Sequence, residues 1–224
     1  MRIHLQNELE KLKKRIISLS ALVEENLRLA LKSVERRDTC LAEMVMDRDR
    51  EIDELEVEIE EDCLKILALH QPVATDLRFL ICVLKMNNDL ERIGDLAVNI
   101  AERARRFSTE DPIDKASDLP KMAAKAQSML RRGLDSVVNR DTRLAREVLA
   151  ADDEVDAVYQ QIIRQVRDRL QNMPVNVDEL LQVLAVAKQI ERVADLATNI
   201  AEDTIYMAEG KIVRHGFGPA ADAK

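Results

Sequence analysis

A stretch of twelve residues that occurs twice constrains the fold of this chain more than any other feature of its sequence. The first copy, residues 91–102, reads ERIGDLAVNIAE, and the second, residues 191–202, reads ERVADLATNIAE. Nine of the twelve positions are identical. Self-similarity at a long, fixed spacing is typical of a duplicated structural unit. We therefore predict that the chain contains two copies of one unit.

Each copy predicts a helix with an apolar side and one polar stripe. At 100° per residue, Glu91, Asp95 and Asn99 fall within about 80° of one another on a helical wheel. Leucine, isoleucine and alanine fill the opposite side. A merely solvated face accepts any polar residue, whereas the second copy keeps the same three residue types at Glu191, Asp195 and Asn199. This identity favours a functional role for the stripe.

The composition predicts an all-helical protein without a nucleic-acid partner. The 224 residues include only 5 Gly and 5 Pro, and 34% of them are charged. The net charge of −8 is opposite in sign to the surfaces that neutralise nucleic-acid phosphates. The longest apolar run, residues 79–84, is far shorter than the ~20 residues that span a bilayer. The cysteines form no CxxC pair, so we expect a cytoplasmic protein.

The order of helical patterns predicts six helices, arranged as two tandem antiparallel three-helix bundles that are related by the internal repeat. The first helix should stop at residues 36–38, with Asp38 or Thr39 capping the second, which should end before Pro72. The third should run from about Thr75 to Phe107. We divide the chain into a first repeat, a linker, a second repeat and a flexible tail, at residues 1–107, 108–120, 121–209 and 210–224.

The second helix of each half carries two aspartates four residues apart, and these should face the repeated stripe. Residues at the same height in an antiparallel hairpin lie equally far from the turn, because both helices rise ~1.5 Å per residue. Asp53 and Glu91 are centred on residue 72, and so are Asp49 and Asp95. The predicted turn falls at this position. The second half repeats the arrangement about its own turn with Asp152 and Asp156.

Four carboxylates gathered in this way need something to offset their repulsion. Two carboxylates at ~6 Å repel by roughly 3 kcal/mol at an effective dielectric constant of ~20. Protonation, arginine partners, separation by solvent or a bound cation would each relieve this energy. Oxygen donors suit Mg²⁺, Mn²⁺, Ca²⁺ or iron. We favour a cation and keep a solvated or arginine-neutralised stripe as the alternative.

Residues 72–102, PVATDLRFLICVLKMNNDLERIGDLAVNIAE, together with the second motif and the closing EDTIYMAEGKIVRH, closely resemble the PhoU family of phosphate-signalling proteins. The resemblance extends from Met1 to about His215. One departure is Leu196, where many members have histidine.

The resemblance implies a multinuclear cluster of divalent metal ions in each half, of iron or zinc, with magnesium or manganese as further candidates. The implied ligands of the first site are Asp49, Asp53, Glu91, Asp95 and Asn99. Those of the second site are Asp152, Asp156, Glu191, Asp195 and Asn199.

The resemblance also implies a non-enzymatic negative regulator of the phosphate-starvation response and of phosphate uptake. Its implied partners are the sensor histidine kinase of the Pho system (PhoR) and the ATPase of the Pst phosphate transporter (PstB). Through these partners it would act at the inner face of the membrane, and assembly as a homodimer is compatible with this role.

Two other functions remain as alternatives. A di-metal carboxylate oxidase would use Glu-x-x-His motifs on facing helices, but His4, His70 and His215 all lie outside the repeated motifs. A metal-free helical scaffold would carry the stripes only as solvated faces. No glycine-rich phosphate-binding loop of the GxxxxGK[ST] or GxGxxG type occurs in the sequence.

Overall fold

The computed structural model describes residues 2–107, 118–172 and 177–213, and this part of the chain contains six α-helices and no strand. The helices are α1 (Arg2–Arg36), α2 (Thr39–His70), α3 (Ala74–Ala104), α4 (Leu119–Asn139), α5 (Thr142–Asn172) and α6 (Val177–Glu209). The predicted fold class, an all-α protein of six helices in two repeats, is confirmed.

Matching aspartates start the second helix of each half. The Asp38 side chain accepts a hydrogen bond from the backbone N–H of Leu41 at 3.1 Å, as predicted. Asp141 accepts one from the backbone N–H of Leu144 at 3.0 Å at the start of α5. Such caps satisfy backbone donors that have no partner within the helix. The same local chemistry therefore sets the α1–α2 and α4–α5 turns.

The end of α3 differs from the prediction. The helix ends at Ala104 instead of Phe107. The chain turns there and buries the Phe107 ring, which is 6% exposed. The Arg37 guanidinium lies 5.6 Å from the centre of this ring. Periodicity did not reveal this, because Phe107 joins the core from outside the helix.

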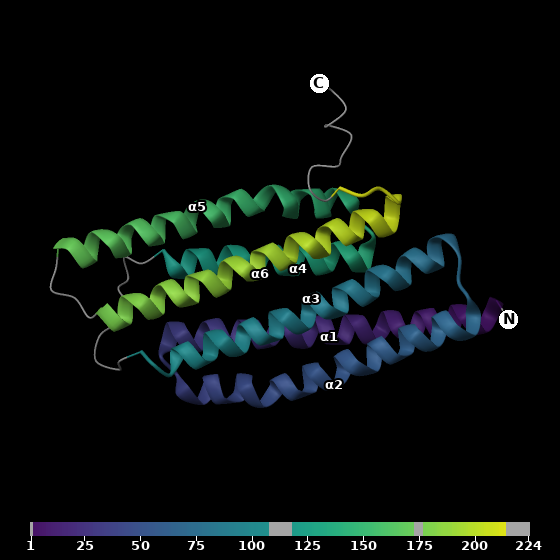
Figure 1. The fold of residues 1–224 in the computed structure, drawn as a ribbon, viewed down its shortest axis with the longest axis horizontal. Coiled ribbons are helices and arrows are strands. Elements are labelled where there is room, and N and C mark those ends of the chain that lie inside the picture. Colours follow the sequence, from purple (N-terminus) through teal and green to yellow (C-terminus); the bar gives the residue numbers. More distant parts are fainter. Residues whose placement is uncertain (1, 108–117, 173–176, 214–224) are drawn as a thin grey trace, which may run out of the picture.

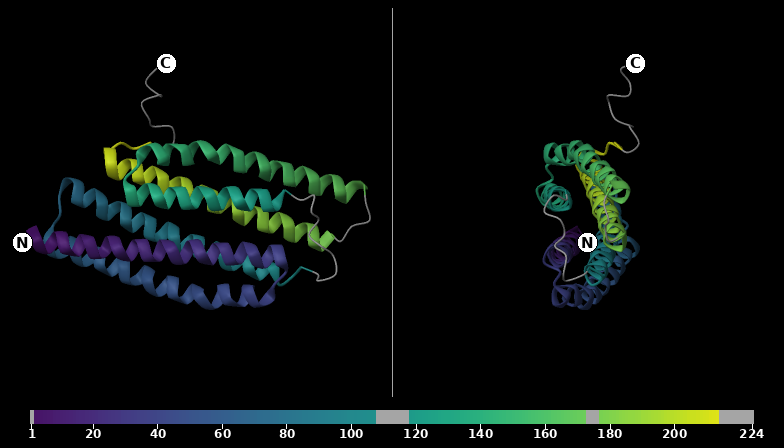
Figure 2. Two further views of the ribbon diagram at one scale, coloured as in Figure 1. Left: turned by 180° about the vertical axis from the view of Figure 1, so that it is seen from behind. Right: turned by 90° about the vertical axis from the view of Figure 1, so that its left-hand side faces the viewer.

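The six helices form two layers (Figures 1 and 2). Helices α2, α3, α6 and α5 lie side by side in that order, and α1 and α4 cover one side of this row. Within the first half α3 packs against α1 and α2, and within the second half α6 packs against α4 and α5. The two halves meet chiefly where α3 packs on α6.

One continuous core joins the two halves. Leu90 and Ile93 of α3 and their counterparts Ile190 and Val193 of α6 are all buried in the same apolar cluster. Because protein interiors are closely packed, a change in the volume of a core side chain in one half disturbs the packing of the other half. The two repeats therefore share a core through their third helices.

The predicted linker and the predicted tail lie only partly within the described residues. Helix α4 begins at Leu119, inside the predicted linker, whereas residues 108–117 lie outside the described part of the chain, as do residues 214–224 of the predicted tail. Within the three described ranges, no helix combines the length and the apolar character needed to cross a membrane.

Candidate metal centres

In the first half, α2 and α3 bring the predicted carboxylates face to face. Asp49 and Glu91 are half-buried, and Asp53 and Asp95 are exposed. Burial, together with the charges of Asp53 and Asp95, raises the pKa of Asp49 to about 6. Burial also raises the pKa of Glu91, and the charges of Asp95, Glu56 and Asp53 add to this rise. The carboxylates of the two helices thus act on one another.

The position of Gly94 shows how closely the two helices approach at this cluster. A Cβ atom at Gly94 would lie 3.1 Å from Oδ1 of Asp49 and 3.3 Å from Cγ2 of Ile52. The Asp49 carboxylate therefore lies against the α3 backbone one residue before Asp95. The predicted register of the α2–α3 hairpin is confirmed.

The second half repeats this arrangement on α5 and α6. Burial raises the pKa of Asp152 to about 6, with further contributions from the charges of Asp156, Asp195, Asp153 and Glu191. Burial and the charge of Glu191 raise the pKa of Asp195, and the charge of Lys188 opposes this rise. Four carboxylates at the predicted positions again face one another across a hairpin.

The sequence analysis missed several residues near the clusters. Glu56 adds a fifth carboxylate to the first cluster, and its Oε1 accepts a hydrogen bond of 3.0 Å from Nδ2 of Asn87. In the second cluster, Nζ of Lys188 lies 2.5 Å from Oε2 of Glu191 and 5.6 Å from the centre of the Tyr159 ring. Helical spacing could have revealed Glu56 and Lys188, each three residues from a predicted ligand.

The two predicted asparagines occupy different surroundings. Asn99 lies exposed on α3, one turn after Asp95. Asn199 lines a cavity between α3 and α6, where its hydrogen bond to Asp89 partly offsets the rise in the pKa of that carboxyl group that burial causes. The structure thus places Asn199 toward the other half of the molecule.

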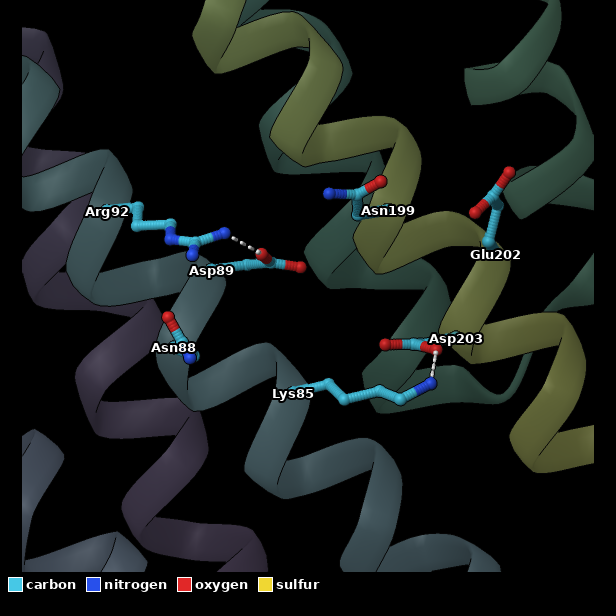
Figure 3. A pocket seen from close by; sticks show the side chains of 7 residues that line it. All are labelled: Lys85, Asn88, Asp89, Arg92, Asn199, Glu202 and Asp203. Atoms are coloured by element: carbon cyan, nitrogen blue, oxygen red, sulfur yellow. Dashed lines mark hydrogen bonds and ion pairs between the residues drawn. The ribbon is translucent and has the colours of Figure 1, made fainter. Parts of the chain in front are cut away.

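This inter-half cavity is a second polar feature of the α3–α6 face (Figure 3). It measures about 240 Å³ and is lined by Lys85, Asn88, Asp89, Arg92, Asn199, Glu202 and Asp203. Lys85 Nζ lies 3.0 Å from Oδ1 of Asp203, and Arg92 lies 4.0 Å from Asp89. Burial and the charge of Asp203 raise the pKa of Asp89 to about 6. The cavity's opposite charges connect the two halves.

The chemistry of both clusters fits a hard cation. The facing acids offer carboxylate oxygens, which are the donors that hard cations prefer. In the first cluster, burial and then repulsion by the neighbouring carboxylates raise the pKa of Asp49 and of Glu91. In the present side-chain positions, no three histidine, cysteine, aspartate or glutamate residues of the described ranges form a ready-made metal-binding group. The exposed Asp53 and Asp95 can change rotamer to approach an ion. The metal role of these residues stays a prediction.

The fold and the paired acidic faces define a duplicated helical-bundle protein whose halves meet through their third helices. The family model described as PhoU domain matches residues 16–104 and again residues 119–204. The chain belongs to the PhoU family. One match lies on each of the two repeats that the sequence revealed.

Similar proteins extend over nearly the whole chain. A relative from Aquifex aeolicus, named phosphate-specific transport system accessory protein PhoU homolog, is 38% identical over 93% of this chain and 94% of that protein. One of the same name from Clostridium acetobutylicum is 34% identical over 93% of this chain and 95% of its own length.

Solved structures share the fold. The crystal structure of PhoU from Pseudomonas aeruginosa superposes with a TM-score of 0.88 at 31% identity, covering 92% of this chain and 99% of that one. A phosphate transport system regulatory protein PhoU from Streptococcus pneumoniae gives a TM-score of 0.87 at 27% identity, with coverage of 93% and 99%.

Proposed function

We propose that this protein is a non-enzymatic regulator that limits phosphate uptake and damps the phosphate-starvation response when phosphate is plentiful. The observation that carries the proposal is the match of both repeats to the PhoU domain. Its relatives are named as accessory proteins of the phosphate-specific transport system. In this role the protein acts in the cytoplasm as an adaptor between a PhoR-like sensor kinase and a PstB-like transporter ATPase.

The acidic clusters are the proposed cation sites of this adaptor. Asp49, Asp53, Glu91 and Asp95 would hold the ions of the first site, and Asp152, Asp156, Glu191 and Asp195 those of the second. Bound divalent cations, whether iron, zinc, magnesium or manganese, would neutralise the negative charge of these carboxylates. Because each acidic pair faces its partner across the hairpin, such ions would hold α2 in register with α3, and α5 with α6.

The histidine positions favour the regulator over a di-metal oxidase. His70 lies in the last turn of α2. It is therefore about 25 Å along the helix axis from Asp53, at a rise of ~1.5 Å per residue. His4 is exposed near the start of α1. Neither is placed to act as the Glu-x-x-His ligand on which that oxidase chemistry depends.

A complementation experiment tests the proposed function. A bacterium lacking its own PhoU-family gene carries a reporter of the phosphate-starvation response and receives this gene on a plasmid. We expect the wild-type chain to repress the reporter in high phosphate and to bind the purified kinase or ATPase of that bacterium. Unchanged reporter output, with no binding to either partner, would refute the regulatory function.

A variant pair connects this test to the clusters. The D95A/D195A variant should repress less, although its helical circular dichroism is retained. The matched control E43A/D135A removes the same charge from exposed positions outside both clusters, and should repress like the wild type. Equal repression by the two variants would show that the regulatory function does not depend on the clusters.

A further inference from the structure

The second carboxylate cluster contains a cation of its own. Nζ of Lys188 lies 2.5 Å from Oε2 of Glu191, whose side chain is only 15% exposed. The same ammonium group lies 5.6 Å from the centre of the Tyr159 ring on α5. A cation over an aromatic face is held by the ring's electrostatic field. Lys188 is thus fixed between the two helices that carry the cluster, beside one of its four shared carboxylates.

The first cluster has different groups at both of these positions. The position that corresponds to Lys188, one hundred residues earlier, is Asn88, and the position that corresponds to Tyr159 is Glu56. The first cluster therefore has a fifth carboxylate in place of the ring. It has no amine at the position of Lys188, because Asn88 stands there, exposed and lining the inter-half cavity. Asn87 holds Glu56 there, because its Nδ2 donates to the backbone oxygen and to Oε1 of Glu56 at 2.9 and 3.0 Å.

The ion pairs of the two clusters differ in the same way. None of the first cluster's carboxylates forms an ion pair with lysine or arginine in the portion of the chain that the structure describes. The second cluster has one further acid, the exposed Asp153 beside Asp152. Its counterpart Arg50 turns away to pair with Glu54 at 3.0 Å. Asp153 is more exposed to solvent than Glu191, so its charge is screened more strongly.

We propose that Lys188 is a built-in competitor for the cation at the second cluster, so that the first cluster binds divalent ions more tightly and fills first. This inference rests on the proposed cation sites. A divalent ion that approaches Glu191 must displace the ammonium group from the carboxylate and is repelled by its charge. At the first cluster an arriving ion meets five carboxylates, none of which is paired with a lysine or arginine of the described residues.

Titration of the metal-free protein with Mn²⁺ tests the inference, with binding followed by calorimetry and by the electron paramagnetic resonance signal of unbound Mn²⁺. The D152N/D195N background leaves only the first cluster, and D49N/D95N leaves only the second. We expect the first cluster to bind Mn²⁺ at least roughly tenfold more tightly, since a neighbouring unit charge acts strongly on a divalent ion at a partly buried site.

Exchanging Lys188 and Asn88 between the repeats should then reverse the difference in Mn²⁺ affinity between the two clusters. K188N should raise the affinity of the second cluster by at least roughly fivefold, and N88K should lower that of the first by a similar factor, since each changes one adjacent charge. K188R keeps the charge and serves as the control, with the second cluster remaining weak. Lys188 and Asn88 are both exposed, and circular dichroism checks that each of the three variants is folded.

The outcomes separate this inference from the proposed sites. Equal affinities of the two clusters in the wild-type sequence, or no gain in K188N, would overturn the competitor role while leaving cation binding intact. No cluster-dependent Mn²⁺ binding in any variant, K188N included, would overturn both the competitor role and the proposed sites. A gain in K188N that K188R does not show would support the competitor role.

Discussion

The two halves keep the same carboxylates on equivalent helices, but the groups around these carboxylates have changed. Glu56 of the first half corresponds to Tyr159 of the second, Asn88 to Lys188, and Gly94 to Ala194. The first cluster is consequently more acidic, and its Asp49 carboxylate lies close to the α3 backbone at Gly94. The second has an internal ion pair. The comparison indicates that the facing acids are the shared requirement, whereas their neighbours set the properties of each site.

The two ends of the α3–α6 interface differ as well. At one end Lys85 pairs with the buried Asp203, beside the buried Asp89. The corresponding positions at the other end, in the same order, are Ala185, Arg103 and Gln189. There Arg103 donates a hydrogen bond to the Gln182 side chain at 3.3 Å. The packing between the halves is therefore symmetric in its apolar core and asymmetric in its charges.

The largest expected effect tests whether the apolar core really is shared. L90A and I190A each remove a fully buried side chain where the halves meet, and each should lower the free energy of unfolding by about 3 kcal/mol. Because one cluster joins the halves, both variants should unfold in a single transition by circular dichroism and calorimetry. Two separate transitions, with only the mutated half destabilised, would show independent units.

A smaller effect should distinguish the two ends of the interface. K85M removes the cation beside Asp203, whose side chain is 5% exposed, and should cost about 2 kcal/mol because the carboxylate stays buried. At the other end of the interface, R103M loses one hydrogen bond to Gln182 and should cost about 0.5 kcal/mol. Urea denaturation measures both values. Equal losses in the free energy of unfolding would show that the polar contacts at the two ends of the interface contribute equally to stability.

The pH dependence should be alike in the two clusters. The pKa of Asp49 and of Asp152 is raised to about 6 in the folded protein, above the value near 4 of an unfolded chain. Each group therefore contributes stability that is fully present below about pH 4 and is lost as the pH rises through about 6.

D49N and D152N test this dependence in metal-free protein. Each should stabilise the fold at pH 7 relative to the wild type, by on the order of 1 kcal/mol after allowance for solvent screening, and by less at pH 5. Urea denaturation in EDTA at the two pH values gives the difference. A stabilisation that is larger at pH 5 than at pH 7 would contradict the assigned pKa shifts.

The smallest expected effect concerns the close approach at Gly94. G94A gains helix propensity but places a Cβ atom 3.1 Å from Oδ1 of Asp49. We expect these effects to offset each other to within about 0.5 kcal/mol, because alanine favours a helix by only about 1 kcal/mol and the end of the Asp49 side chain can move. The reverse change A194G should lose the propensity without relieving crowding, and chemical denaturation measures both. Stabilisation of G94A by the full propensity difference would show that the contact imposes no strain.

Local rules predicted the hairpins and the facing acids. The cap at Asp38, the turn at Pro72 and the equal rise of two helices sufficed to place Asp49 and Asp53 opposite Asp95 and Glu91. These features depend on short segments and fixed helical geometry. The family matches then confirmed the repeats that the motif copies had indicated.

Contacts between the halves could not be predicted in the same way. Asn199 shares the acidic stripe of α6 on a helical wheel, yet it lies beside Asp89 of α3, because α3 and α6 pack together. No periodicity within one helix specifies which helix of the other half will cover it. The burial of Phe107 after the end of α3 is likewise a tertiary effect. Rotamers of exposed acids such as Asp95 depend in addition on what they bind.

The most direct test of the account is the metal content of protein purified without chelators or a metal-affinity column, measured by mass spectrometry. The variant with Glu91, Asp95, Glu191 and Asp195 all changed to alanine is measured alongside it. A control variant changes four exposed acids outside the clusters to alanine: Glu10, Glu35, Glu43 and Asp135. We predict at least two divalent ions per chain in the wild type and in the control, and their loss in the cluster variant. Wild type without bound metal, or equal metal content in all three proteins, would contradict the assignment of the paired acidic faces as cation sites.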